Sequence, residues 1–386
     1  MRGTIIKRGG GYSVVLDLDL GRGPDGKRLR RWHSGYRTKK DAERARVELL
    51  GRLDQATYVD PSKTTLSDFL DRWLQHMGTV RDARTVERYG ELLRLHVRPT
   101  LAGVPLQKLT PVHFTDLYAR LLAEGRRDGR PGGLSPRTVG HVHRALHRAL
   151  HQAVRWRLLA TNPAGDLELP PAGKTEMVTL DHQQAARLLA AVEEAPGWLR
   201  MLVTLGLALG CRRGELLALR WADVDLDEGT VRVGRSLRIV GGRLDVKGPK
   251  TEAGYRTLAL PGFAVAALRR HRAAQAELRL ALGGTYHDED LVVCQPDGRP
   301  VRPDYASAAF RTLVARAELP AAVHVHTLRH SAASFLAAEG VPASDIAAQL
   351  GHTDGGQLAL RVYVHPLEEN KRRAAAILDG IIGGAQ

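Results

Sequence analysis

Two proline-containing breaks divide the 386-residue chain into three stretches with different hydrophobic patterns, and this division constrains its fold most strongly. The breaks, at residues 58–63 and 170–173, interrupt both helical and strand periodicity. The chain is also longer than a single hydrophobic core usually organises. We therefore predict three domains, at residues 1–60, 64–170 and 175–386.

The first stretch combines strand and helix patterns. Hydrophobicity alternates at residues 12–20 and 27–33, and the turn-rich residues 21–26 between them predict a β-hairpin. A helical pattern follows Thr38, a residue type that caps helices. The stretch carries 14 Lys and Arg against 8 Asp and Glu. A sheet-and-helix domain with this charge indicates a DNA-contacting module, with a plain small β-rich domain as the alternative.

The middle stretch is helical in its periodicity. Apolar residues fall on one face of a helix that begins at Leu66, and further helical patterns cover residues 85–96 and 111–122. Ser135 and Pro136 have the residue types of a helix cap and of the first helical position, and a long amphipathic pattern follows them. We therefore predict an α-helical domain.

The C-terminal stretch changes its period twice, from helical to strand-like and back. Helical patterns cover residues 181–194, 197–210, 214–219 and, apart from a loop at 285–303, the chain from residue 262 onward; strand patterns cover residues 230–233, 243–246 and 255–260. We predict a mainly helical domain with a small antiparallel sheet.

The charge balance points to a polyanionic partner. Lys and Arg number 57 against 42 Asp and Glu, which gives a formal net charge of +15. Nucleic acid is the leading candidate, and an ordinary solvated basic surface is the alternative. Cys211 and Cys294 are too few for a disulfide framework, no signal-peptide pattern is present, and the apolar residues 198–209 are too few to cross a bilayer. We expect a cytoplasmic protein without a membrane partner.

Two basic motifs of the C-terminal stretch carry candidate phosphate ligands. Arg212 lies in GCRRGELLALRW, directly before a helix in which Glu215 is placed to fix it by an ion pair. Lys250 lies in KGPKTEAG between two predicted strands, where a hairpin loop would let a compact ammonium reach a phosphate or a leaving oxygen. The alternatives are a capped helix with solvated arginines and an ordinary basic turn.

Histidines and a tyrosine complete the set of candidates. His326 and Arg329, in HVHTLRH, lie three residues apart and share one face of a helix that begins here. A zinc site is the rival interpretation, but the histidines lack cysteine partners and no HExxH or paired CxxC motif is present, so we expect neither metal nor cofactor. His352, in LGH, precedes Tyr363 by eleven positions. A lone tyrosine is more often a packing residue.

In combination, these motifs resemble the signature of tyrosine recombinases of the phage integrase family. The matching residues, in order, are Arg212, Lys250, His326, Arg329, His352 and Tyr363. The middle stretch is similar to the family's core-binding domain through TVERY, HVRP and LTP, and the first stretch is similar to the arm-type DNA-binding domain of the larger phage integrases. The resemblance implies a multidomain, mainly α fold, with an N-terminal sheet and helix, a helical core-binding domain and an α+β catalytic domain of the DNA breaking-rejoining fold.

The resemblance also implies a reaction. Tyr363 attacks a DNA phosphodiester, forms a 3′-phosphotyrosine and releases a 5′-hydroxyl, without metal or ATP. Arg212 and Arg329 stabilise the charge on the phosphate, because their guanidinium forks match its geometry. His352 adds a further donor.

Proton transfer and positioning fall to the remaining residues. Lys250 is expected to protonate the departing 5′-oxygen, His326 to accept or orient the phenol proton, and Glu215 to position Arg212. His324 competes with His326, but only His326 has the three-residue step to Arg329. The spacing from His352 to the tyrosine is slightly long for the family.

The implied partner is double-stranded DNA at attachment or crossover sites, bound by a homo-tetramer on synapsed DNA. Accessory DNA-bending and directionality factors, and a nucleoid-associated place in a bacterial host cell, are further expectations. The function implied is integration and excision of a phage or another mobile element. The alternatives are a resolvase or type IB topoisomerase-like enzyme, and a non-catalytic DNA-binding or architectural protein. A C-terminal helix at residues 367–382 is expected to pack either on its own domain or on a neighbouring protomer.

Overall fold

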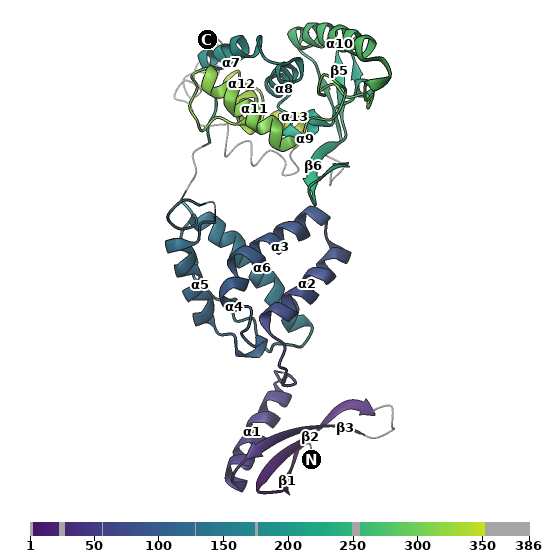
Figure 1. The fold of residues 1–386 in the computed structure, drawn as a ribbon. Coiled ribbons are helices and arrows are strands. Elements are labelled where there is room, and N and C mark those ends of the chain that lie inside the picture. The colour runs from purple at the N-terminus through teal and green to yellow at the C-terminus, as the bar shows by residue number, and fades with distance from the viewer. Residues whose placement is uncertain are drawn as a thin grey trace, which may run out of the picture. The chain divides into compact units, whose positions relative to one another are not determined.

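The computed structural model describes residues 3–22, 28–55, 57–127, 129–173, 177–248 and 255–351. The chain forms two compact units, Met1–Lys174 and Thr175–Gln386, which Figure 1 draws as ribbons. Among the described residues, no helix has both the length and the apolar character needed to cross a membrane. The division into three domains remains a prediction. Lys250, His352, Tyr363 and the C-terminal helix expected at 367–382 lie outside the described residues.

The first unit begins with an antiparallel sheet of three strands in the order β1-β2-β3. The strands are β1 (Gly3–Arg8), β2 (Gly11–Arg22) and β3 (Arg28–Tyr36), and the helix α1 (Lys39–Asp54) follows. The helix packs on the sheet, where Val14, Leu16 and Ala42 are fully buried. Thr38 caps α1 as predicted, because its side chain accepts a hydrogen bond from the backbone N–H of Asp41. The strand β1 was not predicted.

The rest of the first unit is helical, as predicted. Its elements are α2 (Leu66–Val80), α3 (Ala83–His96), α4 (Arg98–Leu101), the 3-10 helix η1 (Leu106–Lys108), α5 (Pro111–Glu124) and α6 (Pro136–Arg155). Large side chains from different helices form one core, among them Phe69, Trp73, Phe114 and Leu146. Ser135 is the N-cap of α6, and its hydroxyl accepts a hydrogen bond from the backbone N–H of Thr138.

The second unit is built around an apolar helix, α8. Its helices are α7 (His182–Val192), α8 (Gly197–Leu209), α9 (Arg213–Leu217), α10 (Gly262–Leu282), α11 (Pro303–Arg316), α12 (Val325–Ala338) and α13 (Ala343–Leu350), with 3-10 turns at Trp221–Asp223 and Gly283–Thr285. Both α12 and α10 contact α8 (Figure 1). Residues on all sides of α8 are buried, including Trp198, Met201 and Leu205, which is typical of a core helix. The helix predicted from the pattern at residues 197–210 is therefore confirmed.

Two small sheets complete the second unit. The strands β4 (Val224–Asp225), β5 (Thr230–Val233) and β8 (Arg256–Ala259) form one sheet, and β6 (Ser236–Val240) and β7 (Arg243–Lys247) form the other. The predicted hairpin around Lys250 is wrong, because β7 pairs with β6 while β8 pairs with β5. The segment between β7 and β8 therefore connects two sheets. The actual hairpin is β6–β7, whose turn at Gly241 and Gly242 has the positive φ angles that glycine tolerates.

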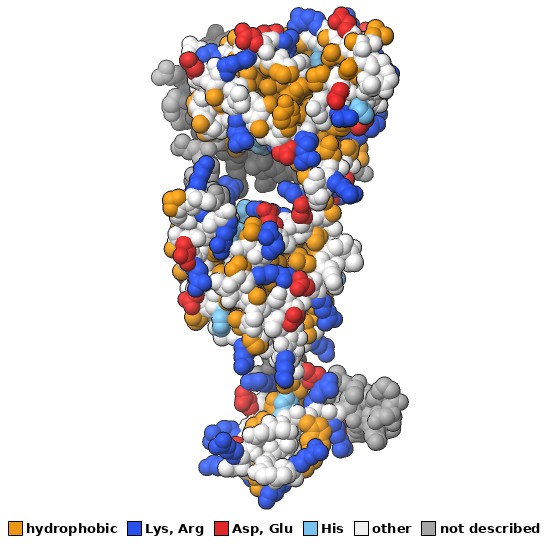
Figure 2. Space-filling model, viewed as in Figure 1, with side chains coloured by type: hydrophobic (Ala, Val, Ile, Leu, Met, Phe, Trp, Pro, Cys, Tyr) orange, Lys and Arg blue, Asp and Glu red, His pale blue; other side chains and the backbone are white. Residues whose placement is uncertain are grey.

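Basic side chains are spread over both units. On the face drawn in Figure 2, Lys and Arg side chains occur along the whole described chain, with fewer acidic side chains between them. A distributed basic surface of this kind is suited to a long polyanion more than to a small anionic ligand.

Candidate active site

The turn between α8 and α9 presents Arg212. The left-handed residue Gly210 (φ 63°) ends α8, and Arg212 is the N-cap of α9. Glu215 binds Arg212 twice, since its Oε2 accepts from the backbone N–H and its Oε1 accepts from Nη1, both at 2.9 Å. The Arg212 side chain is 45% exposed, whereas that of Glu215 is 9% exposed. The predicted ion pair thus forms, and a buried carboxylate orients an accessible guanidinium.

Two glycines permit the close packing around this turn. A Cβ on Gly210 would lie 2.7 Å from Leu350 Cδ2, at the end of α13. A Cβ on Gly214 would lie 2.6 Å from the carbonyl oxygen of Leu237 in β6. At Gly214 a side chain would collide with backbone, so this glycine sets how near α9 lies to β6; at Gly210 the positive φ also favours glycine, beside the close contact with Leu350.

The helix α12 brings two further candidates to the same turn. Arg329 is almost completely buried, and its Nη1 donates a hydrogen bond of 2.9 Å to the carbonyl oxygen of Gly210. His326 lies on the first turn of α12, as predicted, and is exposed. His324 is the N-cap, and its ring nitrogen Nδ1 lies 2.5 Å from the hydroxyl of Thr327. The helix cap occupies His324 and leaves His326 as the candidate histidine.

Arg212 and His326 line one cavity of about 460 Å³. The cavity is lined by Arg212, Arg213, Gly214, Ser236, Leu237, Ser307, His324, Val325 and His326. Arg213 hydrogen-bonds to Ser307 at its wall, while Nη2 of Arg212 lies 3.5 Å from the carbonyl oxygen of Gly351. Four of the seven residues predicted from the sequence, Arg212, Glu215, His326 and Arg329, therefore come together.

The charged residues around this turn shift the pKa values of His326 and Glu215. Although His326 reaches solvent, the protein around its ring at the cavity wall partly desolvates it, and this desolvation together with the positive charges of Arg329, His324 and Arg212 lowers its pKa to about 4. Its imidazole is therefore neutral at physiological pH. Burial by itself raises the pKa of Glu215, but the contacts with Arg256 and Arg212 outweigh burial and leave this pKa below its usual value. The carboxylate is therefore ionised.

Arg256, in β8, is a residue of the site that the sequence interpretation missed. Its Nη2 donates to Glu215 Oε2 at 2.9 Å, and its Nε donates to the carbonyl oxygen of Gln349 in α13 at 2.9 Å. The alternating pattern of this strand could have predicted that Arg256 is buried. In an alternating strand, Arg256 shares a face with Leu258, which is buried, so an arginine here points inward and needs a buried partner.

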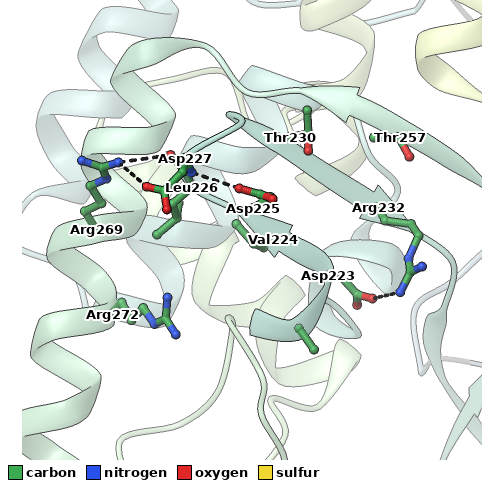
Figure 3. A pocket seen from close by; sticks show the side chains of 11 residues that line it. Asp223, Val224, Asp225, Leu226, Asp227, Thr230, Arg232, Thr257, Arg269 and Arg272 are labelled. Carbon is green, nitrogen blue, oxygen red and sulfur yellow. Dashed lines mark hydrogen bonds and ion pairs between the residues drawn. The ribbon is translucent and has the colours of Figure 1, made fainter.

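A second cavity of the same unit, of about 540 Å³, is lined by β4, β5, β8 and α10 (Figure 3). It contains both acidic and basic side chains, most of which bind one another or the backbone, while Arg272 lies over the ring of Trp221. Arg269 pairs with Asp227 at 3.1 Å, and Arg232 pairs with Asp223 at 3.7 Å. The carboxylate of Asp225 accepts two backbone N–H groups. This cavity is therefore less suited to a charged ligand than the one at Arg212.

A third cavity, of about 400 Å³, lies between α3 and α6 of the first unit and is basic. It is lined by Arg88, Tyr89, Leu92, His141, Arg144 and Arg148. Arg148 Nη1 donates to the hydroxyl of Tyr89 at 2.9 Å. Partial burial and the charges of Arg144, Arg88 and Arg137 lower the pKa of His141, as expected where positive potential accumulates. This potential favours an anion.

In the described ranges, no three His, Cys, Asp or Glu side chains are grouped so as to hold a metal ion.

Comparison with known families identifies the chain. The model of the phage integrase family matches residues 178–370, half of the chain, and the model of the phage integrase N-terminal SAM-like domain matches residues 65–122. The chain belongs to the phage integrase family. This phage integrase family member is thus a tyrosine recombinase, one of a class of enzymes that cleave and rejoin DNA. The resemblance predicted from the sequence is confirmed.

Relatives align with this integrase over nearly its whole length. It is 26% identical to a tyrosine recombinase XerC-like protein of Caldanaerobacter subterraneus, over 97% of this chain and 98% of that protein. It is 29% identical to an integrase of Streptomyces ambofaciens, over 95% of this chain and 93% of that protein.

Solved structures share its fold. The Tn1549 transposon integrase in complex with transposon right end DNA superposes with a TM-score of 0.68 at 19% identity, covering 82% of this integrase and 99% of that chain. A lambda integrase tetramer bound to a Holliday junction gives a TM-score of 0.60 at 17% identity, covering 92% and 93%. The predicted fold class, mainly helical with small sheets, is confirmed.

Proposed function

We propose that this integrase cuts and rejoins DNA at specific sites through a 3′-phosphotyrosyl bond to Tyr363, and that it integrates and excises a phage or another mobile element. The observation that carries the proposal is the grouping of Arg212, His326 and Arg329 around one turn, in a member of a DNA-cleaving family. The relative from Streptomyces ambofaciens, an integrase by name, supports the mobile-element role.

The arginines stabilise the charge that gathers on the phosphate in the transition state. Arg212 supplies an accessible guanidinium held by a buried carboxylate, so its orientation is fixed before DNA binds. Arg329 adds permanent positive charge from beneath the turn. His352, which directly follows Gly351 in the sequence, contributes a further donor. Fixed charge of this kind stabilises a transition state because it needs no rearrangement during the reaction.

Proton transfer accompanies the exchange of oxygens on phosphorus. The phenol oxygen of Tyr363 forms a bond to phosphorus, the bond to the 5′-oxygen breaks, and Lys250 gives that oxygen a proton. His326 accepts or orients the phenol proton, and its ring, which is neutral at physiological pH, has a nitrogen lone pair free to accept a hydrogen bond from the phenol. The reverse attack by a 5′-hydroxyl of a partner strand rejoins the DNA, so no nucleotide is consumed.

The remaining parts of the chain bind DNA. Residues 1–60 act as an arm-type DNA-binding domain and residues 64–170 as the core-binding domain, whose basic cavity between α3 and α6 takes a backbone phosphate. The active assembly is a tetramer on two synapsed duplexes, by analogy with the lambda integrase tetramer on a Holliday junction. Accessory DNA-bending and directionality factors act with it.

The substitution Tyr363→Phe tests this function. It removes one hydroxyl and leaves the aromatic ring, so DNA affinity in a mobility-shift assay should stay within about 5-fold of wild type, since one lost hydrogen bond is worth on the order of 1 kcal/mol or less. The denaturant-stable protein–DNA complex on DNA spanning the element ends should disappear. A Tyr363→Phe variant that still forms this complex shows that another residue is the nucleophile.

A further inference from the structure

Arg256 joins two parts of the site that are distant in the sequence. Its Nη2 binds the same carboxylate that orients Arg212, and its Nε binds the carbonyl oxygen of Gln349, near the end of α13. Gly351, two residues further on, offers its carbonyl oxygen to Arg212 Nη2 at 3.5 Å. One guanidinium in β8 therefore contacts both Glu215 and the segment that leads to His352.

The charges around Glu215 explain why a second arginine matters. Arg212 and Glu215 alone form a pair with no net charge, and such a pair stabilises weakly the additional negative charge that develops on the phosphate in the transition state. With Arg256 the group of three carries a net charge of +1, because one carboxylate is shared by two guanidinium groups at 2.9 Å. Because Arg256 offsets the charge of the carboxylate, less of that negative charge cancels the field of Arg212 at the substrate.

Burial separates the roles of the two arginines. The Arg256 side chain is 7% exposed and that of Arg212 is 45% exposed. Arg256 therefore cannot contact a DNA phosphate while it holds these partners. Its Nη1 is buried and has no hydrogen-bond partner among the described residues, so the protein bears a desolvation cost to keep this guanidinium in place.

We propose that Arg256 is a positioning residue for DNA cleavage, which offsets the charge of Glu215 so that Arg212 can act on the scissile phosphate and which fixes the end of α13 beside it. This proposal rests on the proposed function of the integrase. It assigns to Arg256 an effect on the rate of cleavage and little effect on DNA binding.

The test measures single-turnover formation of the covalent complex on a nicked duplex spanning the element ends, together with DNA affinity and the midpoint of thermal unfolding. Arg256→Gln removes the charge, and Arg256→Lys keeps the charge but has one donor nitrogen in place of the separate Nε and Nη2 that reach Gln349 and Glu215. The double variant Arg256→Gln/Glu215→Gln removes the carboxylate as well. Arg279→Gln is the matched control, because Arg279 pairs with Asp288 on the surface of the same unit and is 62% exposed.

Arg256→Gln should slow cleavage about 100-fold at saturating protein, as expected when a catalytic group is misplaced. Its DNA affinity and that of Arg279→Gln should match wild type. Arg256→Lys should recover most of the rate. The double variant should cleave about 10-fold faster than Arg256→Gln, because the uncompensated carboxylate that holds Arg212 is gone.

A purely structural role gives a different pattern. In that case the double variant is no faster than Arg256→Gln, or Arg256→Lys is as slow as Arg256→Gln, and either result overturns the proposal. If Arg256→Gln does not fold, the cleavage rate of Arg256→Lys alone decides between a positioning role and a purely structural role. Failure of the wild-type protein to form any covalent complex refutes the proposed function instead, so the two failures are distinguishable.

Discussion

At the scale of single residues, the site separates exposed from buried positive charge. Arg212 is accessible, whereas Arg329 and Arg256 are buried and held by protein oxygens. The buried arginines fix the geometry of the turn, and the exposed one is left to meet the substrate. This arrangement places permanent charge near the phosphate without requiring several long side chains to become ordered when DNA binds.

The lowered pKa of His326 predicts the pH dependence of cleavage. With its pKa lowered to about 4, this imidazole is largely neutral in the free protein across the neutral pH range, and it becomes protonated only as pH falls toward that value. The pH profile of kcat/KM reports the free enzyme. We expect no step attributable to His326 between about pH 5.5 and 8, a window above this value and spanning the ordinary histidine pKa. A step near pH 6.5 that is present in wild type and absent from His326→Gln contradicts the prediction.

Lys250 is assigned the role of general acid, and the rate of cleavage with a modified leaving group tests this role. Lys250→Ala should slow cleavage of ordinary DNA by about 100-fold or more. A substrate with a bridging 5′-phosphorothiolate should restore much of the rate, because a thiolate leaves without a proton. The matched control, Lys247→Ala, removes a nearby lysine and should cleave both substrates like wild type. Equal slowing of Lys250→Ala on both substrates argues against the assignment.

Residue types were predictable from the sequence, and their surroundings were not. The order of the motifs, through its resemblance to the family signature, identified Arg212, His326 and Arg329, and the position of Glu215 in the helix after Arg212 identified it as an ion-pair partner. The partnership of Glu215 with Arg256 was missed, since it joins residues 41 positions apart and depends on how β8 packs against α9 and α13. The burial of Arg329 likewise follows from the packing of α12 on α8.

At the scale of elements, the site depends on how closely short segments approach one another. The five-residue helix α9 would not be stable alone, and its contacts with β6 and α8 hold it in place. The backbone of Gly214 lies against the carbonyl oxygen of Leu237, which leaves no room for a side chain. Small changes here are expected to move Arg212.

Gly214→Ala tests this dependence. The added Cβ would lie 2.6 Å from a backbone oxygen, so α9 or β6 must shift. We expect a loss of about 1–3 kcal/mol in the free energy of unfolding, measured with urea, and slower formation of the covalent complex. Gly262→Ala is the control, because a Cβ at this first residue of α10 meets nothing within 4 Å. Equal stability and equal rates for the two variants rule out the close-packing argument.

Long elements were predicted better than short ones. The helices α2, α3, α5, α6 and α8 have clear amphipathic or apolar patterns and caps, and the structure contains them close to the predicted positions. The strands β1 and β6 were missed, and the hairpin was placed at Lys250 instead of at Gly241 and Gly242. A strand of five or six residues contains only two or three repeats of the alternating pattern, so the pattern alone does not identify it. Such a segment becomes a strand because it pairs with another strand, and pairing cannot be predicted from the local pattern.

At the scale of the whole molecule, basic charge extends over both units (Figure 2) and predicts strongly salt-dependent DNA binding. Removing Arg144 and Arg148 together, which line the basic cavity between α3 and α6, should reduce the slope of log affinity against log salt by about 2. Arg120→Ala is a control in the same unit, because Arg120 pairs with Glu124 on α5. An unchanged slope in the double variant shows that this cavity makes no phosphate contact.

The central claim is that this integrase forms a covalent bond between Tyr363 and the 3′ end of a DNA strand at a specific site. The most direct test incubates the protein with DNA spanning the element ends, digests the trapped complex with protease and nuclease, and identifies the modified peptide by mass spectrometry while the cleaved ends are sequenced. We predict a nucleotide joined through its 3′-phosphate to Tyr363, at one position on each strand. A nucleotide on another residue, a 5′ linkage, or cleavage scattered along the DNA contradicts the claim.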